Sequence, residues 1–176
     1  PSATGEVTPF HITVFSIVLG SLGMVILWNF CNPLTMWLTV ATFVGYAVIY
    51  TWLLKPATPQ NIVIGGIAGA LPPVIGWACV NAIDFRPLSL LFIIFLWTPA
   101  HFWALAINHI DDYAQAKLPM MPNVVGVQKT KKQILIYAVL TVLSTFLPYV
   151  LKMAGWFYLG VSVFFGIGFI YLCTQL

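Results

Sequence analysis

Charged side chains are scarce in this chain of 176 residues. They make up 6% of the sequence, and only four of them are acidic, Glu6, Asp84, Asp111 and Asp112. About a quarter of the residues in a soluble globular domain are charged, so the composition excludes that class. The seven Lys and Arg residues give a net charge of +3. That is too little basic surface for nucleic acid, and we expect no nucleic-acid partner.

Cysteine is also scarce, with three residues, Cys31, Cys79 and Cys173. They lie in or beside apolar runs, and their spacing is not that of metal ligands. We therefore expect all three to be small, buried hydrophobic side chains.

Long apolar runs, in contrast, fill most of the sequence. Hydrophobic residues make up 61% of the chain, and the mean hydropathy is +0.98. A membrane-spanning helix needs about 20 consecutive apolar residues. Six runs approach that length, at 10–30, 34–54, 61–83, 87–110, 133–153 and 155–176. Because strand-like alternation is absent, we predict an all-α integral membrane protein, a single membrane domain over 1–176 in the lipid bilayer.

Basic residues are unevenly divided between the two ends of the predicted bundle. If six spans alternate in direction, the N-terminus, the turn at 55–60 and the loop at 111–132 share one end. That end carries Lys55, Lys117, Lys129, Lys131 and Lys132, and the other end carries Arg86 and Lys152. The positive-inside rule then predicts that the 111–132 loop lies in the cytoplasm, or in the matrix of a mitochondrion.

The stretch from Trp97 to Tyr113 adds polar groups to an apolar run. Its His101 would lie at membrane depth, where polar groups are rare and usually functional. If one helix spans the whole stretch, His101, Asn108 and Asp112 fall within roughly 40° of each other on one face. We predict a functional site there. The alternatives are a histidine that links helices and ordinary solvated acids at a helix end.

Carboxylate and amide oxygens suit Mg2+, which typically takes one or two carboxylates together with phosphate oxygens and water. Asp112, helped by Asp111 and Asn108, would supply such ligands. On the same side, Lys55 and the N-terminus of a helix that begins at Asn61 would both attract an anion. The alternative for Lys55 is a side chain that only snorkels to the membrane surface.

Glycine and proline mark one of the predicted spans. Gly65 and Gly69 have the spacing that permits close helix contact. Pro72 and Pro73 must interrupt the helical hydrogen bonds. We expect tight packing followed by a break in this span.

Several motifs together resemble a known family. They are Leu54-Lys55, Thr58 to Gly66, Gly69 to Trp77, Trp97 to Ala106, and Asp112 to Pro122. In these segments the chain resembles the protoheme IX farnesyltransferases, which belong to the intramembrane aromatic prenyltransferases. The resemblance extends from Gly5 to about Lys132. The resemblance implies an all-helical bundle of about nine spans, of which six lie in this chain, with two Asp-rich motifs that hold Mg2+.

The resemblance also implies an activity: transfer of a farnesyl group from farnesyl diphosphate to protoheme IX, which gives haem O for terminal oxidases. The expected catalytic residues are Asp112 and His101, the metal ligands Asp112 and Asp111, and the substrate-binding residues Lys55, Asn61, Asn108 and Tyr113. The implied location is a bacterial cytoplasmic membrane or the mitochondrial inner membrane, with haem-handling or oxidase assembly proteins as partners.

The chain departs from the family pattern at several positions. It contains only the second Asp-rich motif, in which Asn108 replaces the first carboxylate. Pro56 replaces a basic residue, Ala100 a proline and Lys117 a glycine. We expect a fragment that lacks the first motif and is inactive alone, because the site would lose much of its negative charge.

Two other functions are compatible with the residues. A carrier or channel would use His101 and Asp112 to line an ion path. A noncatalytic membrane subunit would pack against a partner through Gly65 and Gly69.

Overall fold

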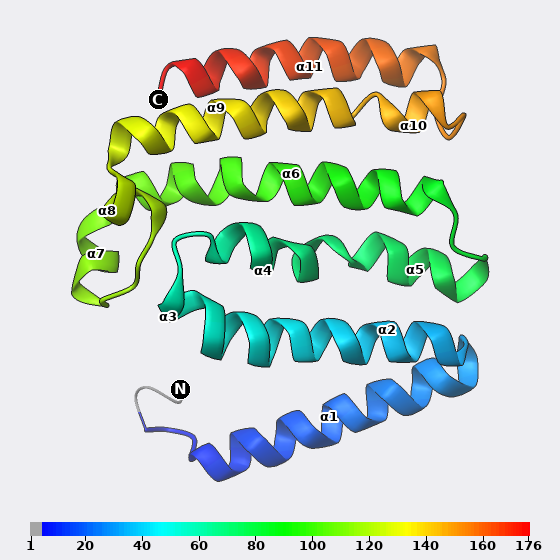
Figure 1. Ribbon diagram of the computed structural model, residues 1–176. Helices are drawn as coiled ribbons and strands as arrows, with labels where there is room; N and C mark the ends of the chain where they lie inside the picture. Colours follow the sequence, from blue (N-terminus) through cyan, green and yellow to red (C-terminus); the bar gives the residue numbers. More distant parts are fainter. Residues whose placement is uncertain (1–4) are drawn as a thin grey trace.

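The computed structural model describes residues 5–176, and every regular element in that range is a helix (Figure 1). The elements are α1 (Pro9–Phe30), α2 (Pro33–Val44), the π-helix η1 (Gly45–Leu54), α3 (Lys55–Ala57), α4 (Asn61–Ala70), α5 (Pro72–Val80), α6 (Phe85–Asn108), α7 (Ile110–Gln115), α8 (Met121–Val125), α9 (Val127–Ser144), α10 (Leu147–Val150) and α11 (Trp156–Thr174). They form six helices of membrane-spanning length and composition, Pro9–Phe30, Pro33–Ala57, Asn61–Val80, Phe85–Asn108, Val127–Val150 and Trp156–Thr174. The prediction of a six-span, all-α membrane protein is confirmed.

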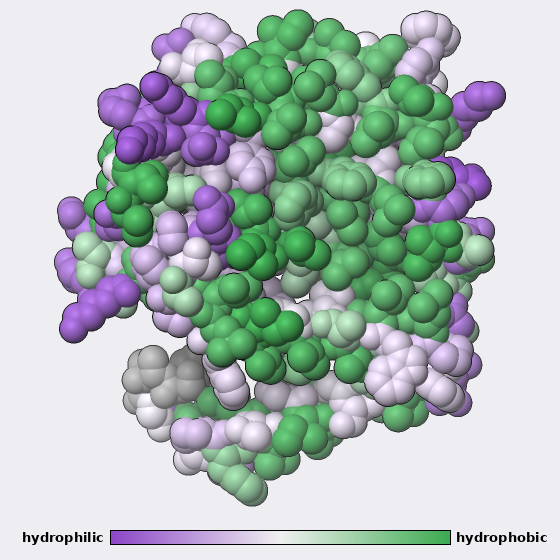
Figure 2. Space-filling model, in the orientation of Figure 1, coloured by the Kyte–Doolittle hydropathy of each residue, from purple (hydrophilic) through white to green (hydrophobic). Residues whose placement is uncertain are grey.

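The spans lie side by side in chain order, and α4 and α9 pack on α6 (Figure 1). The start of α1, the short helix α3, the α7–α8 segment and the C-terminus all lie at one end. The remaining turns lie at the other. This is the division expected from the sequence. Figure 2 shows a broad hydrophobic surface between more hydrophilic ends, as a bilayer requires.

Side-chain caps fix where three of the spans begin. The Thr8 hydroxyl accepts a hydrogen bond from the His11 N–H, and the Asp84 carboxylate accepts one from the Arg86 N–H. The Asn32 side chain accepts from the Thr35 N–H at 2.8 Å. Each cap satisfies a backbone donor that the first helical turn leaves free.

The second span contains a π-helix that the sequence did not predict. The Thr51 hydroxyl donates to the Tyr46 carbonyl, five residues earlier, and the Lys55 N–H donates to the Tyr50 carbonyl in the same register. Pro56 has no N–H, so this ladder of hydrogen bonds cannot continue beyond Lys55. The span ends soon after, at Ala57.

The glycine-rich span packs closely, as expected, but its two glycines differ. A methyl group added to Gly65 would overlap the ring of Tyr50, whereas one added to Gly69 would meet nothing within 4 Å. Gly66 faces Thr98 of α6, whose Cγ2 would lie 3.2 Å from an added Cβ. The expected break is present, since α4 ends at Ala70 and α5 begins at Pro72.

We predict that Gly65→Ala lowers the stability of the bundle by about 1–3 kcal/mol, because the new methyl must displace the Tyr50 ring. Gly69→Ala is the matched control and should be neutral or slightly stabilising, since alanine favours helix. Thermal unfolding in detergent micelles measures both. Equal effects of the two substitutions would contradict this account of the packing.

Candidate active site

The end of α6 differs from the sequence expectation. The helix stops at Asn108, and His109 has φ −124° and ψ 29° before α7 begins at Ile110. The His109 N–H donates to the Ala106 carbonyl, three residues back, at 3.2 Å, which closes the helix with a tighter turn. The prediction of one helix from Trp97 to Tyr113 is therefore wrong. Asp112 does not share a helix face with His101.

The two acids lie in the first turn of α7, where both are exposed. The Asp112 carboxylate accepts a hydrogen bond from His109, with Nδ1 and Oδ2 3.0 Å apart. The Asp112 side chain remains 74% exposed in this pair, so its second oxygen is free to bind a ligand. Sequence reasoning assigned His109 no role, although an Asp three residues after a His is a recognisable local pair.

Two contacts hold α7 against the bundle, and a residue in a left-handed conformation follows it. The half-buried Tyr113 packs on the hydrophobic core that includes Trp103 and Met120. The Asn123 side chain donates to the Ile110 carbonyl at 2.9 Å. After α7, Lys117 adopts φ 54°, a left-handed conformation. Glycine adopts this conformation most easily, which explains why the family resemblance leads one to expect glycine there.

Asn61 lies in the interior, with no exposed surface. Its Nδ2 donates to the Lys55 carbonyl at 3.3 Å and contacts the Met120 Sδ at 3.8 Å. Its Oδ1 has no hydrogen-bond partner within the described part of the chain. The side chain thus joins the α3–α4 turn to the segment between α7 and α8. Its expected role in binding substrate stays a prediction.

Lys55 is half-buried at the same end of the bundle. Within residues 5–176 it forms no ion pair; the salt bridges in that range are Arg86–Asp84 and His109–Asp112. An unpaired ammonium group near the membrane surface can bind an anion. The structure leaves Lys55 available for that role.

His101 and Asn108 do share a surface, as the seven-residue spacing predicted. They line an apolar groove of about 270 Å³ between α6 and the end of α11. The ring of Trp97 stacks on His101, with centroids 4.4 Å apart and planes 16° apart. Within residues 5–176, the His101 ring makes no hydrogen bond. Stacking on Trp97 therefore orients the ring, and both of its nitrogens are free. Trp97 also lines a second hollow of about 210 Å³ against Gly66 and Gly69 of α4.

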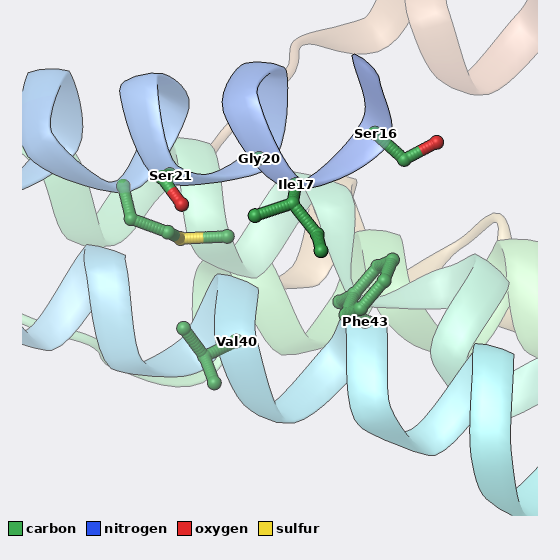
Figure 3. Close-up of a pocket in the computed structure, with 7 residues that line it drawn as sticks. Ser16, Ile17, Gly20, Ser21, Val40 and Phe43 are labelled. Carbon is green, nitrogen blue, oxygen red and sulfur yellow. The ribbon is translucent and has the colours of Figure 1, made fainter. Parts of the chain in front are cut away.

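A larger hollow, about 580 Å³, lies between α1 and α2 (Figure 3). Its lining is Ser16, Ile17, Gly20, Ser21, Met24, Val40 and Phe43. No ionisable side chain is in this set. It suits an apolar occupant such as a lipid chain but supplies no group for catalysis.

The acid pair meets the requirements of Mg2+ only in part. Within the described residues, no group of three or more His, Cys, Asp or Glu side chains could hold a metal ion. Mg2+ at phosphate sites needs only one or two carboxylates, because phosphate oxygens and water complete the octahedron. Asp111 and Asp112 therefore fit an ion that arrives with a diphosphate.

Comparison with known proteins gives the same family across the whole chain. The family model described as the UbiA prenyltransferase family matches residues 1–176. The chain is 62% identical over 171 residues to a protoheme IX farnesyltransferase of Polynucleobacter asymbioticus, covering 97% of this chain and 58% of the relative. Proteins of the same name are 61% identical in Polynucleobacter necessarius, with the same coverage, and 54% identical in Methylibium petroleiphilum, covering 96% and 55%.

The chain thus spans somewhat more than half the length of these curated relatives. No solved structure matches it.

We predict that Asn61→Ala destabilises the bundle by about 1–2 kcal/mol, because the Lys55 carbonyl loses its buried donor. Asn29→Ala is the control, since the exposed Asn29 amide bonds only to the Val25 carbonyl in its own helix. Thermal unfolding in micelles distinguishes the two. An Asn61→Ala protein as stable as the parent would favour a role in binding substrate instead.

Proposed function

Because this chain belongs to the UbiA prenyltransferase family, we propose that the protein transfers a farnesyl group from farnesyl diphosphate to protoheme IX and so makes haem O. One observation carries the proposal: the exposed acid pair of α7 begins just beyond Asn108, at the end of an apolar groove that contains the free imidazole of His101. The names of the relatives support the choice of substrates.

The diphosphate would bind at the α7 end. Asp111 and Asp112 would hold Mg2+, and Lys55 would pair with the phosphate oxygens. When bound, Mg2+ supplies positive charge that stabilises the diphosphate as a leaving group. The hydrogen bond from His109 fixes one oxygen of Asp112 and leaves the other to bind. The water at this end would solvate the charged product.

The hydrocarbon parts of both substrates would lie deeper. The two apolar hollows that share Trp97 offer separate places for a farnesyl chain and a porphyrin. A neutral imidazole is a common ligand of haem iron, so His101 would hold the haem by its iron. The second hollow, against α4, would then shield most of the prenyl chain from water.

The chemistry requires few protein groups. The bond between the farnesyl C1 and its diphosphate oxygen breaks, and the electron pair leaves with the diphosphate. The haem vinyl group attacks C1 and becomes a carbocation at its inner carbon. Water adds to that carbon and loses a proton, which leaves the hydroxyethylfarnesyl side chain. The protein's main tasks are to neutralise charge at one end and to align the apolar parts.

The uneven lysine distribution supports a cytoplasmic position for the 111–132 loop, and the bacterial relatives support a bacterial cytoplasmic membrane. We retain haem-handling and oxidase assembly proteins as proposed partners.

The rival functions have less support. An ion path through His101 and Asp112 is disfavoured because the break at His109 separates the two residues. A packing role of Gly65 toward another protein is disfavoured because Tyr50 of the same chain already covers it.

We predict that Asp112→Asn in the whole protein lowers formation of farnesylated haem by about 100-fold or more, because a metal ligand is lost. The assay incubates the protein with protoheme, farnesyl diphosphate and Mg2+ and detects the product by mass spectrometry. Asp84→Asn, at the opposite end of the bundle, is the control and should keep its activity. Undiminished product from Asp112→Asn would remove this carboxylate from the mechanism, and no product from the parent protein would contradict the proposed function.

We also predict that His101→Ala changes the absorption spectrum of bound ferric haem and weakens its binding roughly tenfold or more, because an iron ligand is lost. Added imidazole should restore the parent spectrum. His11→Ala is the control, since His11 lies at the start of α1 and bonds to Thr8. An unchanged spectrum in His101→Ala would show that the iron is held elsewhere.

A further inference from the structure

Two of the three cysteines lie together at the end of the bundle that is poor in lysine. Cys31 caps the C-terminus of α1, and Cys79 is in the last turn of α5. The side chain of Asn32, next to Cys31, reaches the backbone carbonyls of residues 78 and 79, so the fold brings the two cysteines close together. The expectation that all three cysteines are buried is wrong. Each is a half-buried free thiol, because all lie near the ends of spans.

The approach of the two thiols is fixed by the neighbouring residue. The Asn32 amide donates to the Ala78 carbonyl at 2.6 Å and contacts the Cys79 carbonyl at 3.4 Å. The same side chain caps α2 through the Thr35 N–H. Asn32 thus ties the α1–α2 turn to the end of α5 at the backbone next to both cysteines. The closeness of the two cysteines therefore follows from the backbone arrangement.

The chemical environment of this end favours oxidation. The end carries Arg86 and Lys152, against five lysines at the other end. The proposed sidedness therefore puts Cys31 and Cys79 on the outer face of the membrane. The bacterial periplasm is an oxidising compartment in which disulfides form and persist.

We propose that Cys31 and Cys79 form a disulfide that ties α1 to α5. The oxidant is an external disulfide, from an oxidoreductase or a small thiol. The thiolate of one cysteine attacks that disulfide and releases one reduced thiol. The second cysteine then attacks the mixed disulfide and releases the other, so the two protons of the cysteine pair end on the two released thiols.

Such a link acts on the least supported helix of the bundle. α1 has no buried residue and packs mainly on α2. The hollow in Figure 3 lies between these two helices. A bond from Cys31 to Cys79 would anchor the α1–α2 turn to the end of α5. The disulfide would thus hold the start of the bundle against its middle part.

The test determines the redox state of each cysteine in cells. Bacteria that express the chain are quenched with acid, and free thiols are blocked with one alkylating reagent. The protein is then reduced and labelled with a heavier reagent, and peptides are identified by mass spectrometry. We expect the heavy label on Cys31 and Cys79 and the light label on Cys173. Without reduction, a linked Cys31–Cys79 peptide should appear.

Variants separate this outcome from a change of fold. Cys31→Ser should convert Cys79 to the light label, and Cys79→Ser should do the same to Cys31. Cys173→Ser is the matched control and should leave the link intact. Light label on both Cys31 and Cys79 of the parent chain would overturn the inference. This result comes from the parent chain alone and does not depend on any variant. The inference rests on the proposed sidedness but not on the transferase activity, so product formation with reduced thiols would reject the disulfide alone.

Discussion

The buried amide of Asn61 is the contact on which the candidate site depends. It bonds to the Lys55 carbonyl and touches Met120, so one fully covered side chain holds the α3–α4 turn beside the segment that follows α7. The bond pairs the Lys55 carbonyl, which would otherwise carry the cost of an unsatisfied polar group, while the Asn61 Oδ1 has no partner among the described residues. The free ammonium of Lys55 and the anchored helix with the acid pair are consequently parts of one end of the molecule.

The membrane determines where the charged groups and the apolar groups of the site can lie. Ionic groups must remain at the hydrophilic end, because charge at the bilayer centre is expensive. The groove next to them can stay apolar, since its lining comes from α6 and α11 at membrane depth. The proposed substrates have the same division, with a charged diphosphate and long hydrocarbon parts. The reacting atoms would lie at the boundary.

Sequence alone predicted the features that depend on composition and on helical period. Apolar runs gave the six spans, and the seven-residue spacing put His101 and Asn108 on one groove. The prediction failed for features that depend on the packed bundle. The burial of Asn61 and the closeness of Cys31 to Cys79 require neighbours from distant parts of the chain. The π-helix was also not predicted. The end of α6 at His109 was also missed, since no proline or glycine marks it.

The break at His109 has a consequence for the geometry of the site. A continuous helix would carry Asp112 about 16 Å along the axis beyond His101, away from the bundle. Instead, α7 turns from the end of α6 toward the level of α3 (Figure 1). Its Tyr113 packs against the hydrophobic core. The acids therefore lie over the end of the bundle rather than beyond it. If the helix continued into water, the acids would lie farther from the apolar groove. Under the proposed function, the charged and the apolar parts of the site must act on the same bond, so that separation would hinder the reaction.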